Sequence, residues 1–172
     1  MKTLKTWATA ATLLAVTGTA PAALVSLGDG TVKDTNTNLI WLQNWNINER
    51  AAWGTQKNWA DNLTFAGSSD WELPEISEFV DLFTAYGDLG LVPEFTNVQF
   101  GSYWSGTEIA GNVAWSFNPL SGGQSGVVKS GQFFAVAVRP ADVIASVPEP
   151  QTLALALLAL GATAVARKAR SR

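Results

Sequence analysis

Cysteine and histidine are both missing from the 172 residues of this chain. Their absence excludes disulfides, thiol nucleophiles, zinc sites built from Cys and His, and the Ser-His-Asp and Cys-His catalytic mechanisms. Few classes of enzyme remain, so we expect no catalytic residue, no metal site and no cofactor. A folded body without disulfides must rely on packing alone, for which seven tryptophans and eight phenylalanines are available beyond residue 22.

Basic side chains are scarce in the middle of the chain. Residues 23–147 hold five of the eleven Lys and Arg residues but thirteen of the fourteen acidic residues, which gives a formal net charge of −8. Nucleic acids require clustered Lys and Arg against their phosphates. The composition therefore predicts an acidic domain that does not bind nucleic acid.

Residues 1–22 have the pattern of a secretory signal peptide. A basic start precedes an apolar stretch at residues 8–16, and Ala20-Pro21-Ala22 offers small residues for cleavage. A buried helix or a membrane anchor is the alternative, but this stretch is well short of the ~20 residues that span a bilayer. We expect export, with a single folded domain at residues 23–147.

The domain is organised around Asp70-Trp71-Glu72-Leu73, an extended segment that leads into a helix predicted over residues 73–85. Pro74 suits the first helical turn because its φ is fixed near the helical value. One apolar face then repeats at helical spacing and needs a core to cover it. Its members are Ile76, Phe79, Val80 and Phe83.

Glu75 and Glu78 lie one turn apart at the start of this helix. They could be read as an acid/base pair. Negative charge is also favoured at a helix N-terminus by the helix dipole, and nothing in the sequence indicates the burial that catalytic carboxylates need. We therefore expect a structural role for both.

The remaining pattern predicts an α+β fold with two helices on antiparallel sheet. A turn at residues 36–38 favours a hairpin, with Asn38 at positive φ, and a second helix is expected over residues 56–66, capped by Thr55. Residues 43–54 and 86–101 are expected as loops. Three strands are expected at residues 103–107, 113–117 and 132–138, with a turn at residues 121–126. The strand at residues 132–138 is apolar on both faces, so we place it centrally in its sheet.

Most tryptophans of the body are expected to be packing residues, namely Trp41, Trp71, Trp104 and Trp115. Trp45 and Trp53 differ because they fall in a polar loop with Asn44 and Asn46. Sugar rings stack on aromatic rings and form hydrogen bonds with amides, so these four residues are the candidate ligand site. The alternative is that the loop tryptophans fold back over the core.

Residues 148–172 have three parts. Pro148-Glu149-Pro150 precedes a charge-free stretch at residues 151–166, and a basic cluster follows at residues 167–172. The stretch is long enough to span most of a bilayer, and flanking basic residues can reach the interface. We expect a transmembrane helix with its basic end in the cytoplasm; the alternative is a buried globular helix.

This tail resembles the PEP-CTERM sorting signal of Gram-negative exopolysaccharide producers. In that family an exosortase recognises the tripeptide that corresponds to Pro148, Glu149 and Pro150, cleaves there, and passes the protein on to the surface or matrix. The resemblance implies a transient stay in the inner membrane, followed by release to the cell surface or extracellular matrix.

The body is similar to the domain found at the C-terminus of a bacterial collagen-like adhesin, which is related to C-type-lectin-like and formylglycine-generating-enzyme-like folds. The resemblance covers about residues 28–141. The family usually has glycine at the position of Asn38 and arginine at that of Glu72. The residues that carry it are Asp34-Thr35-Asn36-Thr37-Asn38-Leu39-Ile40-Trp41, Trp71-Glu72-Leu73-Pro74, Glu78, Tyr103-Trp104-Ser105-Gly106-Thr107, Ala114-Trp115 and Val138-Arg139-Pro140.

These observations favour an exported surface or matrix protein with a lectin-like binding module, acting in adhesion or in a biofilm rich in exopolysaccharide. Carbohydrate and the processing exosortase are the expected partners. Two alternatives stay open. One is an enzyme of the formylglycine-generating-enzyme-like fold or a glycan-active hydrolase, and the other is a structural surface protein without a ligand.

Overall fold

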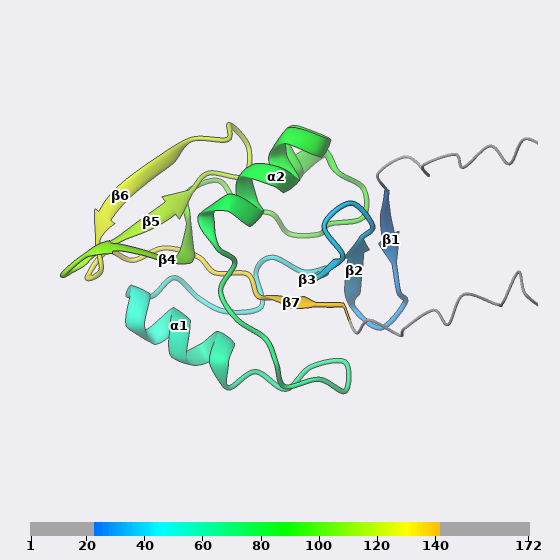
Figure 1. The fold of residues 1–172 in the computed structure, drawn as a ribbon, viewed down its shortest axis with the longest axis horizontal. Helices are drawn as coiled ribbons and strands as arrows, with labels where there is room; N and C mark the ends of the chain where they lie inside the picture. Colours follow the sequence, from blue (N-terminus) through cyan, green and yellow to red (C-terminus); the bar gives the residue numbers. More distant parts are fainter. Residues whose placement is uncertain (1–22, 142–172) are drawn as a thin grey trace, which may run out of the picture. The chain divides into compact units, whose positions relative to one another are not determined.

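The computed structural model describes residues 23–141, and it confirms an α+β fold with two α-helices and two antiparallel sheets in this part of the chain (Figure 1). Within these residues no helix is both long and apolar enough to cross a bilayer. The predicted signal peptide and transmembrane helix lie outside the described residues. In chain order the elements are β1 (Leu24–Ser26), β2 (Thr31–Asp34), β3 (Leu39–Leu42), α1 (Trp53–Asp61), α2 (Ile76–Tyr86), the 3-10 helix η1 (Leu89–Leu91), β4 (Tyr103–Ala110), β5 (Val113–Phe117), β6 (Gln124–Val128) and β7 (Val138–Pro140).

The first sheet has the strand order β1-β2-β3-β7. Its β2–β3 hairpin confirms the predicted turn, with Asn38 at φ 58°. The turn is fixed by the buried carboxylate of Asp34, which accepts hydrogen bonds from Asn36 N at 2.9 Å and Thr37 Oγ1 at 2.9 Å. The hydroxyl of Tyr86 donates a third bond to Asp34 at 2.9 Å, so the end of α2 is tied to this hairpin. Burial, together with this carboxylate, raises the pKa of Tyr86 far above its ordinary value.

The second sheet has the order β4-β5-β6. The strands predicted at residues 103–107 and 113–117 are confirmed, the first of them longer than expected. The turn predicted at residues 121–126 is partly wrong, because β6 already begins at Gln124. The turn lies just before it, where Asn118 Oδ1 accepts from Leu120 N at 3.0 Å. Most of β6 is exposed, so it lacks the alternation of apolar and polar residues by which strands are recognised.

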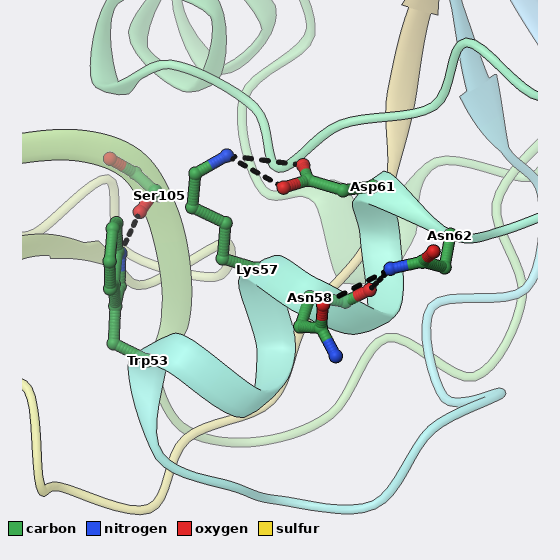
Figure 2. Close-up of polar contacts among 6 residues, drawn as sticks. All are labelled: Trp53, Lys57, Asn58, Asp61, Asn62 and Ser105. Carbon is green, nitrogen blue, oxygen red and sulfur yellow. Dashed lines mark hydrogen bonds and ion pairs between the residues drawn. The ribbon is translucent and has the colours of Figure 1, made fainter.

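Helix α1 begins and ends earlier than predicted. Trp53 is its first residue rather than part of a loop, and Thr55 caps nothing; Ala52 is the N-cap, without a side-chain bond. Figure 2 shows the contact that holds this first residue: the indole Nε1 of Trp53 donates to the carbonyl oxygen of Ser105 at 2.8 Å. The helix ends at Asp61, beyond which the side chain of Asn62 turns back to the carbonyl oxygen of Asn58 at 2.8 Å. Lys57 and Asp61 form an ion pair at 3.0 Å on the exposed face.

Helix α2 begins at Ile76, two residues after the proline that was expected inside its first turn. Glu75 is the N-cap and forms a capping box with Glu78, whose carboxylate accepts from Glu75 N at 2.8 Å. The structural role predicted for both glutamates is confirmed. The helix buries Phe79 and Leu82 most deeply, and Leu82 was not part of the predicted face.

Residues 133–138, which we name the central segment, are not the regular central strand that was predicted. The segment changes partners along its length: Phe133 bridges to Ala51, Phe134 to Tyr103, and Val138 to Glu72. Residues 135–138 are nevertheless fully buried, as apolar side chains on both faces indicated. β7, at its end, lies at the edge of the first sheet. Because no single neighbour runs beside it for long, no continuous ladder forms.

The Trp71-Glu72-Leu73-Pro74 motif packs directly against β4. Gly106 N donates to Pro74 O at 2.8 Å, and a Cβ on Gly106 would lie only 2.8 Å from the carbonyl oxygen of Leu73. Only glycine allows so close a backbone approach. The next residue, Thr107, accepts from Ile76 N at 2.9 Å and donates to the Glu75 carboxylate. The two motifs thus fix the start of α2 on the sheet.

The core is aromatic, and Phe79 lies at its centre. Its ring stacks on Phe117 of the second sheet, with centroids 4.9 Å apart and planes inclined by 10°. It also contacts Trp41 at 5.7 Å and Trp45 at 6.1 Å. The packing role of Trp41, Trp71 and Trp104 is confirmed by their burial, whereas Trp115 is only half-buried. The loop at residues 86–101 also contributes buried side chains, those of Leu89, Val92 and Phe95.

Phe79→Ala should lower the free energy of unfolding by about 3–5 kcal/mol, because the cavity lies where α2 meets both sheets. Phe100→Ala is the matched control: its ring is exposed, and its removal should change stability by no more than about 0.5 kcal/mol. Urea unfolding followed by tryptophan fluorescence measures both. Equal midpoints for the two variants would contradict this account of the core.

Candidate functional site

Trp45, the first predicted sugar-stacking residue, lies in the core with no exposed surface. Its ring stacks on Trp41, with centroids 6.0 Å apart and planes inclined by 10°. Phe95 and Tyr103 pack against it at 5.1 and 5.3 Å. The alternative of a loop tryptophan folded over the core is therefore confirmed. No face of this ring is open to a sugar.

Trp53 has other neighbours than Trp45 and is 8% exposed. Its Nε1 is bonded to Ser105 O, and Lys129 Nζ lies 4.4 Å from the ring centroid, in the position of a cation–π contact. The ammonium group of Lys129 also pairs with Glu108 of β4. The indole therefore fixes α1 on β4 and is shielded by Lys129, and the structure does not join the two predicted tryptophans in one site.

Asn46 is exposed and Asn44 is half-buried, and a second loop joins them. Trp45 N donates to Thr96 O at 2.9 Å, and Thr96 N donates to Gln43 O at 2.8 Å. The side-chain oxygen of Asn44 accepts from Asn46 N at 3.0 Å and from Asn97 Nδ2 at 3.1 Å. Residues 43–46 are thus held beside residues 96–97, with their amide side chains together.

The second loop, residues 96–100, adds side chains to this surface that were not among the predicted site residues. Gln99 Nε2 donates to Asn97 O at 2.8 Å, Asn97 is held at φ 55°, and the neighbouring Phe100 is 90% exposed. We name the group of Asn44, Asn46, Asn97, Gln99 and Phe100 the amide surface. The run Asn97-Val98-Gln99-Phe100 repeats the mixture of amide and aromatic residues seen at 44–46, and that repetition is the signal that could have revealed it.

Tyr103 connects this surface to the core. Its hydroxyl donates to Trp45 O at 3.2 Å and accepts from Gln99 N at 2.9 Å, so one buried group bonds both loops. Burial raises the pKa of Tyr103 to about 12, and the hydroxyl therefore stays protonated at neutral pH and keeps its donor. The two loops are held in place before any ligand arrives.

The amide surface is suited to binding rather than to acid/base chemistry. Within residues 23–141, the side-chain amide of Asn46 and the Nδ2 of Asn44 make no hydrogen bond and remain available. Neutral amides can donate and accept with hydroxyl groups but cannot transfer protons near neutral pH. The described residues also contain no group of three or more acidic side chains arranged to hold a metal ion.

Glu78 is the carboxylate with a clearly perturbed pKa in this part of the chain. Burial raises its pKa above the usual value, and the nearby charges of Glu72, Glu75 and Asp81 add to the effect. The hydrogen bond from Glu75 N acts in the opposite direction. The upward shift in the pKa of Glu78 therefore comes from its burial at the helix start, where the same carboxylate completes the capping box.

The sorting motif Pro148-Glu149-Pro150 lies outside the described residues. Comparison with protein families matches residues 146–171 to the PEP-CTERM protein-sorting motif.

A second family model, the Lcl C-terminal domain, matches residues 30–139. This range contains both helices, the amide surface and all strands except β1 and the last residue of β7. None of the curated proteins matches the chain. The chain therefore belongs to the Lcl C-terminal domain family and carries a PEP-CTERM sorting motif.

Proposed function

We propose that this exported protein binds carbohydrate of the cell surface or extracellular matrix through the amide surface. The observation that carries the proposal is the exposed ring of Phe100 in the same loop as the amides of Asn97, which is bonded to Asn44, and Gln99, which is bonded to Asn97. In this proposal Phe100 takes the stacking role that the sequence assigned to Trp45 and Trp53.

The chemistry of this surface favours a neutral sugar. A sugar ring presents C–H groups on one face, which pack on an aromatic ring, and hydroxyls at its edge, which bond to amides. The loops are fixed by the Tyr103 hydroxyl, so less conformational entropy is lost on binding. The negative net charge of the domain opposes binding of polyanions.

We propose that the domain is a C-type-lectin-like module that binds and does not catalyse. Support comes from the two helices, the two antiparallel sheets, and the first and last strands sharing one sheet. The absence of Cys and His from the chain supports a binding role, and so does the capping box, which gives Glu75 and Glu78 a structural task. An adhesive or biofilm role would follow from sugar binding at the surface.

The sorting motif supports export, processing by an exosortase and a location at the cell surface or outside the cell. We propose in addition that residues 151–166 hold the chain briefly in the inner membrane before cleavage. Their charge-free sequence and the basic cluster that follows support this step.

Phe100→Ala should weaken binding of the mature protein to its best ligand on a glycan array by about two- to tenfold, since one aromatic contact contributes about 0.5–1.5 kcal/mol. Leu91→Ala is the matched control, because Leu91 is also highly exposed, at 81%, and lies outside the amide surface. An equal loss for both variants, or no binding of any neutral glycan by the wild type, would contradict the proposal.

Replacing Pro148-Glu149-Pro150 by three alanines should leave the uncleaved chain in the membrane fraction of its native host. The exosortase would lose its recognition element, while the apolar residues 151–166 would still stop transfer. Mass spectrometry of the wild-type protein from the cell surface should find a C-terminus before residue 151. Recovery of peptides that end at Arg172 from the surface protein would contradict processing.

A further inference from the structure

Within residues 23–141, strand β6 forms an open edge of the second sheet (Figure 1). Four of its five residues are exposed, and β5 is its neighbour in the sheet. The strand contains no charged residue and no proline. Natural proteins usually protect such edges with lysine, proline, bulges or a covering segment, because an open edge can pair with another strand.

The hydrogen bonds at the two ends of the β5–β6 ladder show which groups of β6 face outward. Lys129 N donates to Asn112 O at 2.7 Å, and Asn118 N donates to Gly123 O at 2.8 Å. Hydrogen-bonded and non-bonded pairs alternate in an antiparallel ladder. Between the two bonded ends, Ser125 and Val127 therefore fall in hydrogen-bonded pairs with β5, whereas Gln124, Gly126 and Val128 fall in non-bonded pairs. The backbone N–H and C=O groups of these last three residues point away from β5. Of their outward groups, the carbonyl oxygen of Val128 is already bonded to Gly131 N at 2.9 Å.

The opposite edge of the same sheet is protected. At its start, Trp104 N donates to Phe134 O of the central segment at 2.9 Å. Farther along, the register of β4 with β5 shifts between Trp104 and Glu108 and again between Glu108 and Ala110. Bulges of this kind bend an edge strand and prevent regular pairing. The sheet therefore has one protected edge and one edge able to accept a strand.

An apolar strip lies beside the open edge. Val128 and Ile109 are 49% and 45% exposed, and Val113 lies directly opposite Val128 in the ladder. Ile109 reaches over the sheet to Gly126, where a Cβ would lie 2.6 Å from its Cδ1. A strand added at β6 would cover part of this strip, so pairing would bury apolar surface in addition to forming hydrogen bonds.

We propose that β6 pairs with β6 of a second copy of this chain, antiparallel and related by a two-fold axis, to give a continuous six-stranded sheet. The second copy must offer the same edge, because its β4 edge is protected, and an antiparallel two-fold pair uses one surface on both partners. With Gly126 opposite Gly126, each Gln124 faces the partner's Val128. The outward N–H and C=O groups then meet in pairs, and the carbonyl oxygen of Val128 accepts from the partner's Gln124 N with its second lone pair, in addition to its own Gly131 N.

Charge does not prevent a second copy from pairing at this edge. Two acidic domains repel each other, and like charges placed opposite each other in a sheet are destabilising. β6 contributes no charge, and the cation that follows it, Lys129, is paired with Glu108 of its own chain. Two copies can therefore approach along β6 without placing carboxylates opposite one another in the ladder.

The absence of native cysteine allows a direct test on the mature protein at the surface of its native host. Ser125→Cys places one thiol on the exposed face of β6. In the proposed register the two introduced thiols are diagonal neighbours across the two-fold axis, about 7–8 Å apart. A short bismaleimide should link them. Thr84→Cys, on the exposed side of α2, is the matched control.

Ser125→Cys should give several-fold more cross-linked homodimer than Thr84→Cys. Adding Gln124→Pro should abolish the excess, because proline removes an outward N–H without breaking a bond to β5. Adding Gln124→Ala instead, which keeps the backbone N–H, should preserve the excess of cross-linked homodimer.

Equal yields at positions 125 and 84 would overturn the proposal. It would also be overturned by cross-linked products that contain another protein instead of a second copy, or by dimers that persist with Gln124→Pro.

Discussion

The stacking of Phe79 on Phe117 is the contact on which the rest of this structure depends. The chain has no disulfide, so its two sheets are held together by packing. Phe79 reaches both, since it stacks on β5 of the second sheet and contacts Trp41 in β3 of the first. The capping box and the Thr107 contacts fix the start of α2, and the hydroxyl of Tyr86 ties its end to Asp34 in the β2–β3 hairpin. Anchored at both ends, the helix has little freedom to move this ring out of place.

The same aromatic core sets the position of the candidate binding surface. Trp45 is packed between Trp41 and Tyr103, and the Tyr103 hydroxyl bonds both to its carbonyl and to the backbone of Gln99. The amides at the surface are therefore carried by loops whose backbones are bonded to a buried group. The exposed ring of Phe100 follows directly in the chain. Burying Trp45 removes it as a sugar-binding residue and makes it the support for the residues that remain exposed.

The sequence predicts the parts of this fold whose signals are local. The core position of Phe79 in α2, the turn at Asn38 and the strand β5 follow from spacing and turn chemistry, and the structure confirms them. The start of α1 is not local, because Trp53 is held by Ser105, distant in the chain. β6 escaped recognition for a different reason: an exposed edge strand rich in small residues has no apolar period.

The candidate site shows the same division. Asn44 and Asn46 were identified from a polar loop, and the structure leaves them at the surface. Trp45 was placed with them, but the direction of a loop side chain depends on the core that receives it. Asn97 and Phe100 lie in a segment expected to be a plain connection, and the contact of Asn97 with Asn44 depends on pairing between residues 43–45 and 96. Contacts of this range cannot be derived from periodicity.

Hydrogen–deuterium exchange of Tyr103→Phe tests most directly the claim that the core positions the amide surface. Removing the hydroxyl takes away the acceptor of Gln99 N and a donor to Trp45 O, while the ring itself stays in the core. Exchange at the amide of Gln99 should become faster, and exchange within α2 should stay unchanged. Unchanged exchange at Gln99, or faster exchange spread evenly over both helices and both sheets, would contradict the account.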